Sequence, residues 1–143
     1  MESSGFESRN TALAMSEENA EIVRRTVESF NRWTLAPECF DPEVEYTTQP
    51  DAPMHTTYKG LDGLARSMES LKEAWEIIEA EVRQFIGSGD VLVALLHFHL
   101  RGHSGVELEA DKAWAYWMRE GKIRRMEQYG SKREALQAAG LAE

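Results

Sequence analysis

Cysteine is the scarcest reactive residue of this chain, and basic residues are too few to balance the acidic ones. Cys39 is the single cysteine, so an intramolecular disulfide is excluded. The 16 Lys and Arg residues stand against 25 Asp and Glu residues, which gives a formal net charge of −9. A field of that sign repels phosphate backbones and anionic lipid head groups. Nucleic acid and membrane surfaces are therefore not expected as partners.

The chain also lacks a long apolar run and a basic segment with an apolar centre, which mark membrane-spanning helices and secretory signals. A cytoplasmic location is therefore expected. The length of 143 residues suits one domain. Residues 1–15 carry Ser, Gly, Asn and Glu without a sustained apolar period, and they are predicted to form a flexible N-terminal extension. The folded domain is expected to cover residues 16–143.

Apolar residues at helical spacing predict two amphipathic helices. The first is expected from Glu17 to Trp33, with charged residues on its opposite face. The second carries a stripe made of Leu64, Met68, Leu71 and Trp75.

A period of two predicts strands between and after these helices. The expected strands are residues 44–48, a short one at Tyr58, and then residues 77–87, 91–101, 106–119 and 122–129. Short turns join the last four, so consecutive strands there must be antiparallel. Ser131 and Glu134 form a capping box for a short last helix, and Gly140 suits its C-terminal cap. Helices followed by a meander of strands indicate an α+β domain.

Alternation along a strand assigns its two faces, because residues two apart share a face. One unbroken apolar set is expected inside: Leu92, Ala94, Leu96, Phe98 and Leu100. His97 and His99 then point outward, near His103. No third ligand has a fixed spacing to them, so solvent or a subunit interface is predicted there, and no metal site.

Residues 113–118 are apolar on both faces, with Ala113, Ala115 and Trp117 on one and Trp114, Tyr116 and Met118 on the other. A strand of this kind is buried on both sides. A pocket or core is expected on one face, and either a partner subunit or ordinary core packing on the other.

Several segments carry a family resemblance in their order and spacing. They are Asn19 to Trp33, Phe40-Asp41-Pro42-Glu43-Val44-Glu45-Tyr46, the turn from Tyr58 to Leu64, Gly89-Asp90-Val91, Gly121-Lys122-Ile123 with Tyr129, and the tail from Ala135 to Leu141. From about Ser16 to Leu141 the chain resembles the SnoaL-like branch of the nuclear transport factor 2-like superfamily, which includes polyketide cyclase and ketosteroid isomerase relatives. The resemblance implies a cone-shaped, curved antiparallel sheet packed on N-terminal helices, an apolar pocket and a homodimer. It implies no reaction, because this fold carries enzymes, binders and assembly modules alike.

Position 128 departs from the pattern that the resemblance implies. The cyclases have an acid/base Asp five positions after the Ile of Gly-Lys-Ile, and here Gln128 follows Ile123 at that distance. An amide does not exchange a proton near neutral pH, so the cyclase mechanism does not simply carry over. Gln128 is either a polar residue satisfied by a neighbour or water, or a hydrogen-bond partner for a ligand.

The implied pocket is predicted to be lined by Phe30, Tyr46, Tyr58, Met68, Phe98, Trp114, Tyr116, Met126 and Gln128. The catalytic candidates are His55, in a loop bounded by prolines, and Tyr46 as a hydrogen-bond donor; Glu109 and Asp111 are further carboxylates. The alternative for His55 is a simple exposed loop residue. Cys39 is predicted to be buried and structural.

Three functions stay open at this point. The first is a protein that binds a small hydrophobic molecule in an aromatic-walled pocket. The second is a cofactor-independent cyclase, isomerase or lyase that acts on a carbonyl-containing substrate. The third is a structural dimerisation module whose pocket is occluded. None of the three needs a cofactor or a metal.

Overall fold

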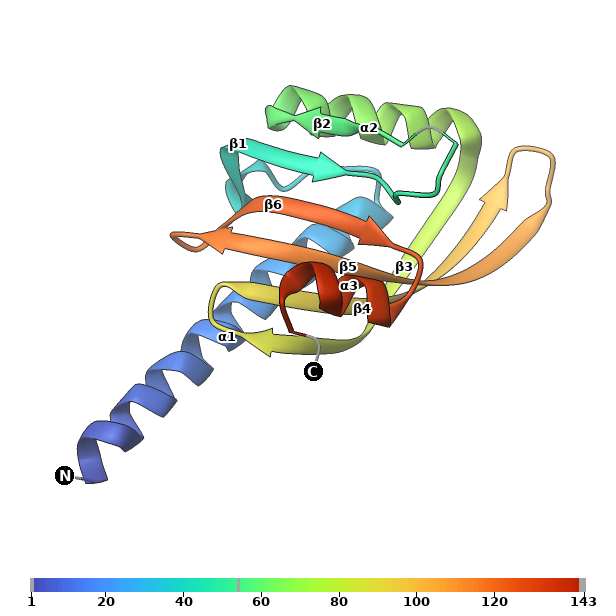
Figure 1. The fold of residues 1–143 in the computed structure, drawn as a ribbon. Helices are drawn as coiled ribbons and strands as arrows, with labels where there is room; N and C mark the ends of the chain where they lie inside the picture. Colours follow the sequence, from blue (N-terminus) through green and yellow to red (C-terminus); the bar gives the residue numbers. More distant parts are fainter. Residues whose placement is uncertain (1, 54, 142–143) are drawn as a thin grey trace.

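One six-stranded sheet curves around α1 and α2 and organises the chain (Figure 1). This computed structural model describes residues 2–53 and 55–141, with side chains from residue 17 onward except at position 88. The elements in chain order are α1 (Glu2–Asn31), η1 (Pro37–Cys39), β1 (Phe40–Thr47), β2 (Thr57–Lys59), α2 (Gly60–Ala74), β3 (Trp75–Ser88), β4 (Val91–Gly102), β5 (Glu107–Arg119), β6 (Lys122–Tyr129) and α3 (Lys132–Ala139). The predicted α+β class is confirmed.

The strands lie in the order β2-β1-β6-β5-β4-β3. Consecutive strands from β3 to β6 pair antiparallel, which confirms the predicted meander. β1 pairs with β6 in parallel, a contact that the sequence did not predict. β1 also starts at Phe40, before the predicted Val44, and its register shifts between Phe40 and Glu45. Pro42 lies in this interval and has no N–H to donate to the ladder, which explains the irregular pairing.

The helix boundaries differ from the prediction at both ends of α1 and at the end of α2. α1 ends at Asn31, two residues before the predicted Trp33. α1 begins at Glu2 rather than Glu17. Side chains before Glu17 lie outside the described set, so the flexibility expected of residues 1–15 stays a prediction. α2 ends at Ala74, and Trp75 is its C-cap and the first residue of β3. Trp75 was expected on the apolar stripe of this helix, and that prediction was wrong because the helix ends one residue earlier.

Two asparagine side chains fix α1 over the sheet. Asn19, which is buried, donates from Nδ2 to the carbonyl of Gly89 at 2.8 Å. Asn31 donates to the carbonyl of Ala80 at 2.9 Å and accepts from its N–H at 2.7 Å. Because β3 is an edge strand, the Asn31 amide takes the place of a neighbouring strand at that residue. These bonds hold the C-terminal half of α1 against β3 and the turn that follows it.

The main core lies on the inner face of the sheet, beneath α1 and α2. Its fully buried members include Val23 of α1, Val44 of β1 and Leu92 of β4. The predicted interior set of β4 belongs to this core, with Leu92, Ala94, Leu96 and Phe98 buried and Leu100 packed against them. Alternation therefore assigned the faces of β4 correctly.

A second core lies on the outer face, beneath α3. Val93, Ala113 and Ala115 of the sheet are buried there against Ala135 of α3, with Trp117 packed beside them. The cover over this face of β5 is thus a helix of the same chain, where the sequence had left a partner subunit and ordinary core packing open. A homodimer stays a prediction from the family resemblance.

α3 forms as its capping residues predict. Ser131 Oγ accepts the N–H of Glu134 at 3.2 Å and donates to the Glu134 carboxylate at 3.0 Å. Gly140 follows with a φ of 72°, the left-handed conformation that closes a helix C-terminus. Across the described part of the chain, no helix combines the length and apolar character needed to cross a membrane.

Candidate functional site

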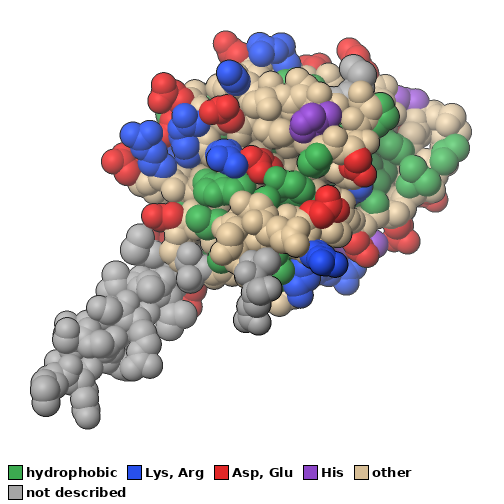
Figure 2. Space-filling view, viewed as in Figure 1, with side chains coloured by type: hydrophobic (Ala, Val, Ile, Leu, Met, Phe, Trp, Pro, Cys, Tyr) green, Lys and Arg blue, Asp and Glu red, His purple; other side chains and the backbone are tan. Residues whose placement is uncertain are grey.

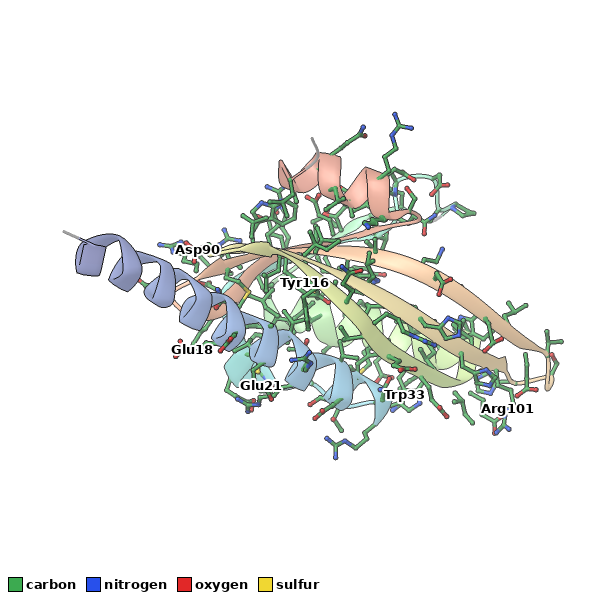
Figure 3. All side chains as sticks on the ribbon, turned by 90° about the horizontal axis from the view of Figure 1, so that it is seen from below. Glu18, Glu21, Trp33, Asp90, Arg101 and Tyr116 are labelled. Atoms are coloured by element: carbon green, nitrogen blue, oxygen red, sulfur yellow. The ribbon has the colours of Figure 1, made fainter. Side chains whose placement is uncertain are left out.

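A cavity of about 70 Å³ lies between α1, α2 and the inner face of the sheet. Residues from every layer line it: Thr26, Val27, Phe30, Thr34, Leu35, Ala36, Phe40, Tyr46, Leu64, Ser67, Met68, Leu71, Ala80, Leu96, Phe98, Trp114, Tyr116 and Met126. Figure 3 shows Tyr116 between the sheet and α1. Within this lining Thr34 is exposed. The half-buried residues are Thr26, Phe30, Leu35, Ser67, Leu71 and Trp114, and all but Trp114 come from α1, the segment after it, or α2. The cavity therefore opens between the end of α1 and α2.

Stacked aromatic rings form one wall of the cavity. The ring centroids of Tyr46 and Trp114 are 5.2 Å apart with an interplanar angle of 10°. Trp114 continues to Tyr116 and to Phe98, each at 6.4 Å, and Tyr58 stacks behind Tyr46 at 6.0 Å. Contacts of this kind contribute about 0.5–1.5 kcal/mol per pair beyond the area that they bury. The wall is therefore a rigid, flat, apolar surface.

The strand register explains how these rings meet. Tyr46 of β1 is opposite Met126 of β6, which is opposite Tyr116 of β5. Trp114 is two residues before Tyr116 and so shares its face. The parallel contact of β1 with β6 thus brings Tyr46 from the first strand beside rings of the fifth.

Three polar groups on this wall are poorly satisfied. Among the described side chains, Trp114 Nε1 is a fully buried polar atom without a hydrogen-bond partner. The hydroxyl of Tyr116, a residue with 2% exposure, also has no partner in the described residues. The Tyr46 hydroxyl reaches Gln128 Oε1 only at 3.5 Å. Leaving a buried polar group unpaired costs about 1–3 kcal/mol, so this wall keeps hydrogen-bond donors that the described residues do not satisfy well.

The lining holds no carboxylate, imidazole, amine, guanidinium or thiol among the described residues. Its ionisable groups are the phenols of Tyr46 and Tyr116. Burial raises the pKa of both, with the neighbouring Tyr58 adding to the effect on Tyr46 and Tyr46 adding to that on Tyr116. The cavity is consequently uncharged throughout the physiological pH range, and no group on its wall acts as a general base there.

The structure brings most of the predicted pocket residues together. Phe30, Tyr46, Met68, Phe98, Trp114, Tyr116 and Met126 line the cavity. Tyr58 and Gln128 do not line it, although Tyr58 stacks on Tyr46 and Gln128 contacts the Tyr46 hydroxyl. Whether these residues bind a ligand stays a prediction.

Several lining residues were missed in the sequence. Leu64, Leu71 and Leu96 share a stripe or strand face with predicted members, so their periodicity was a sufficient signal. Thr34, Leu35 and Ala36 follow α1 in an irregular segment. No periodicity points to such residues, and only the three-dimensional path of the loop places them at the mouth.

The catalytic candidates other than Tyr46 lie outside the cavity. His55 is exposed, and its Nδ1 is 3.0 Å from the carbonyl of Thr48. Cys39, which was predicted to be structural rather than catalytic, is buried, and the pKa of its thiol is raised mainly by desolvation. Neither side chain reaches the cavity, so neither supplies it with a base or a nucleophile.

Histidines and carboxylates pair on the outer face of the β4–β5 hairpin. His97 Nδ1 is 2.7 Å from Asp111 Oδ1, and its Nε2 is 3.2 Å from Glu109 Oε1. His99 Nε2 is 3.2 Å from Glu107 Oε1. These contacts place Glu109 and Asp111 away from the cavity. In the described residues, no three His, Cys, Asp or Glu side chains converge in a way that suits a metal ion.

Comparison with known proteins agrees with this fold. A protein of the nuclear transport factor 2-like fold and unknown function from Burkholderia pseudomallei superposes with a TM-score of 0.71 at 19% identity, over 85% of this chain and 97% of its own. A putative SnoaL-like polyketide cyclase from Jannaschia sp. gives 0.70 at 15% identity, over 90% and 95%. TerC, co-crystallised with polyporic acid, gives 0.71 at 20% identity, over 85% and 97%. At these identities the likeness shows the fold alone.

No match to a curated protein sequence was found. The profile of the SnoaL-like domain, in contrast, matches residues 23–126, well over half of the chain. The matched segment runs from α1 to β6 and contains the cavity and its aromatic wall. The chain therefore belongs to the SnoaL-like domain family, a branch of the nuclear transport factor 2-like superfamily.

Proposed function

We propose that this protein binds a small, neutral, hydrophobic molecule in the cavity between α1, α2 and the sheet. The observation that carries the proposal is the composition of the lining, which is apolar and aromatic with no charged group among the described residues. Ligand pockets commonly combine such walls with a few placed polar groups. Here those groups are Trp114 Nε1 and the hydroxyls of Tyr46 and Tyr116.

The size of the cavity limits what it holds in this form. Its volume of about 70 Å³ is roughly half that of an engineered apolar cavity that binds benzene. Pockets for drug-sized ligands are larger, at about 300–1,000 Å³. A ring or short chain is therefore the part of a ligand that enters, with some movement of the half-buried residues at the mouth.

Binding fits these observations better than the carbonyl chemistry that the family also carries. A proton-abstracting enzyme needs a base within hydrogen-bond reach of its substrate. His55, Glu109 and Asp111 all lie away from the cavity, and Gln128 stands at the family's acid position. The three donors on the wall suit a ligand oxygen, which orients the molecule without requiring a reaction. A homodimer is part of the proposal, on the strength of the family resemblance.

Methionine methyl NMR tests the proposal directly. Met68 and Met126 line the cavity, whereas Met118 is buried in the same core outside the lining. Small neutral aromatic probes such as acetophenone are expected to shift the Met68 and Met126 methyl resonances and to leave Met118 nearly unchanged. An Ala80→Leu variant fills the cavity from β3 and is expected to abolish the shifts. Unmoved Met68 and Met126 signals at saturating probe would exclude binding at this site, and retained binding by Ala80→Leu would place it elsewhere.

A further inference from the structure

The inner face of the β4–β5 hairpin carries an apolar strip whose two residues nearest the hairpin turn are exposed. Val106 and Leu108 are 58% and 50% exposed, and they are the large hydrophobic side chains most exposed in the described part of the chain. We name Leu100, Val106, Leu108 and Ala110 the hairpin strip. Leu108 is opposite Leu100 and Ala110 is opposite Phe98 in the ladder. Figure 2 shows hydrophobic side chains at the outer edge of this hairpin.

The hairpin strip is continuous with the cavity wall. Its member Ala110 is opposite Phe98, and Phe98 lines the cavity. Leu100 packs against the same core, and Leu108 follows beside it. The hairpin then extends past the end of α1 that Trp33 marks in Figure 3. One apolar surface thus runs from the enclosed rings to the exposed tip.

The mouth of the cavity and the hairpin also meet at α2. Leu71 of α2 lines the cavity, and the carbonyl of the next residue, Lys72, is 3.0 Å from His103 Nε2 in the hairpin turn. A molecule that leaves the cavity between α1 and α2 therefore emerges beside the hairpin.

The charges of the hairpin are directed away from the strip. Glu107 and Glu109 alternate with its members and pair with His99 and His97 on the outer face. On the inner face of β5 the charged residue is Lys112, whose Nζ donates to Gln49 Oε1 at 2.8 Å. An uncharged strip of this kind suits a hydrocarbon chain better than a charged peptide or a lipid head group.

We infer that the hairpin strip binds the hydrocarbon tail of an elongated neutral ligand whose head occupies the cavity. The inference rests on the proposed function and adds the class of ligand: a molecule with a flexible alkyl or prenyl chain. Its basis is the mismatch between a cavity of about 70 Å³ and a continuous apolar surface beyond the mouth. The tail removes its own surface and that of Val106 and Leu108 from water, which is the driving force for its binding.

A series of n-alkyl phenyl ketones tests this inference, from acetophenone to dodecanophenone. Affinity for the wild-type protein is expected to rise about three- to fourfold per added methylene, until the chain covers the hairpin strip. In the double variant Val106→Ser, Leu108→Ser, acetophenone binding is expected to stay unchanged while the gain with chain length disappears. The double variant Glu107→Ser, Glu109→Ser, on the opposite face of the same strand, serves as the matched control and is expected to keep the gain.

The outcomes separate the two proposals. If acetophenone fails to bind the wild type, the proposed function itself is wrong. If acetophenone binds but chain length has the same effect in wild type and in the Val106→Ser, Leu108→Ser variant, only the hairpin inference is overturned. Sedimentation of the same samples tests a second copy of the chain as the occupant of the strip. If the wild type is a dimer, the Val106→Ser, Leu108→Ser variant is a monomer and chain length has no effect on affinity, the strip is a dimer interface.

Discussion

The two faces of the sheet are made by the same strands but are covered in different ways. On the outer face, Val93, Ala113 and Ala115 meet Ala135 of α3, and all four are exposed by 1% or less. On the inner face, the rings of Tyr46, Trp114 and Tyr116 meet two helices and leave a cavity of about 70 Å³. Small side chains let a short helix approach closely, whereas stacked rings stand as a flat wall that the facing side chains do not fill. The void thus follows from side-chain shape rather than from the amount of apolar surface.

The largest test of this comparison enlarges one alanine on each face. Ala115→Leu adds three carbons under α3, where no free space adjoins a residue with 0% exposure. It is expected to lower the free energy of unfolding by about 3 kcal/mol. Ala80→Leu adds the same atoms beside the cavity and is expected to change stability by less than about 1 kcal/mol. Urea unfolding of both variants measures the difference, and equal losses would contradict the contrast between the faces.

A smaller effect is expected from removing one indole N–H on each face of β5. The guanidinium carbon of Arg125 lies 4.1 Å from the ring centroid of Trp117 on the outer face, so Trp117→Phe is expected to cost about 1 kcal/mol through the weaker cation–π contact and packing. Trp114→Phe removes the unpartnered Nε1. The stability gained by removing it is expected to offset the stability lost with the ring contacts, so that the net change is less than about 1 kcal/mol. Thermal unfolding compares the two. A larger loss for Trp114→Phe would mean that its Nε1 has a partner in solution.

Sequence periodicity predicted the two faces of β4 and β5 well because these strands pair with each other without a register shift. The apolar set from Leu92 to Phe98 and the split between Trp114 and Ala115 required only the two-residue period of a strand. The resemblance supplied the pocket, and ring-bearing residues on the inner face followed from it. Alternation predicts to which face of the sheet a side chain points, so it identifies the residues that form each face.

Periodicity does not reveal what covers a face or how completely. The sequence did not decide whether a subunit or the chain's own core covers the outer face of β5. The helix that covers it, α3, is short, and its small residues Ala135 and Ala139 give little apolar signal. The parallel contact of β1 with β6 joins segments far apart in the chain, and no local pattern encodes it. Gln128 was placed in the pocket by the family pattern, whereas it lies behind the Tyr46 hydroxyl. Cavity volume depends on all these contacts together, which is why the sequence did not supply it.

The smallest expected effect concerns the charged pairs on the outer face, which have no counterpart among the described residues of the cavity lining. The pKa of His97 is raised above 6.5, first by its hydrogen bond to Asp111 and then by that to Glu109, while desolvation and Arg83 oppose the shift. Because the raised pKa belongs to the folded state, His97 contributes stability that is full below the unfolded pKa and is lost as pH rises through the folded pKa. The exposed site keeps this contribution small.

An NMR titration of the imidazole resonances measures this shift. His97 is expected to titrate above 6.5 in the wild type, and Asp111→Asn is expected to lower its midpoint because the strongest hydrogen bond to the charged ring is weakened. Glu107→Gln, which alters the pair with His99, is the matched control and is expected to leave the His97 midpoint in place. A His97 midpoint at or below 6.5, or one that Asp111→Asn does not move, would show that these outer pairs do not persist in solution. The contrast between a charged outer face and a neutral inner wall would then rest on the cavity lining alone.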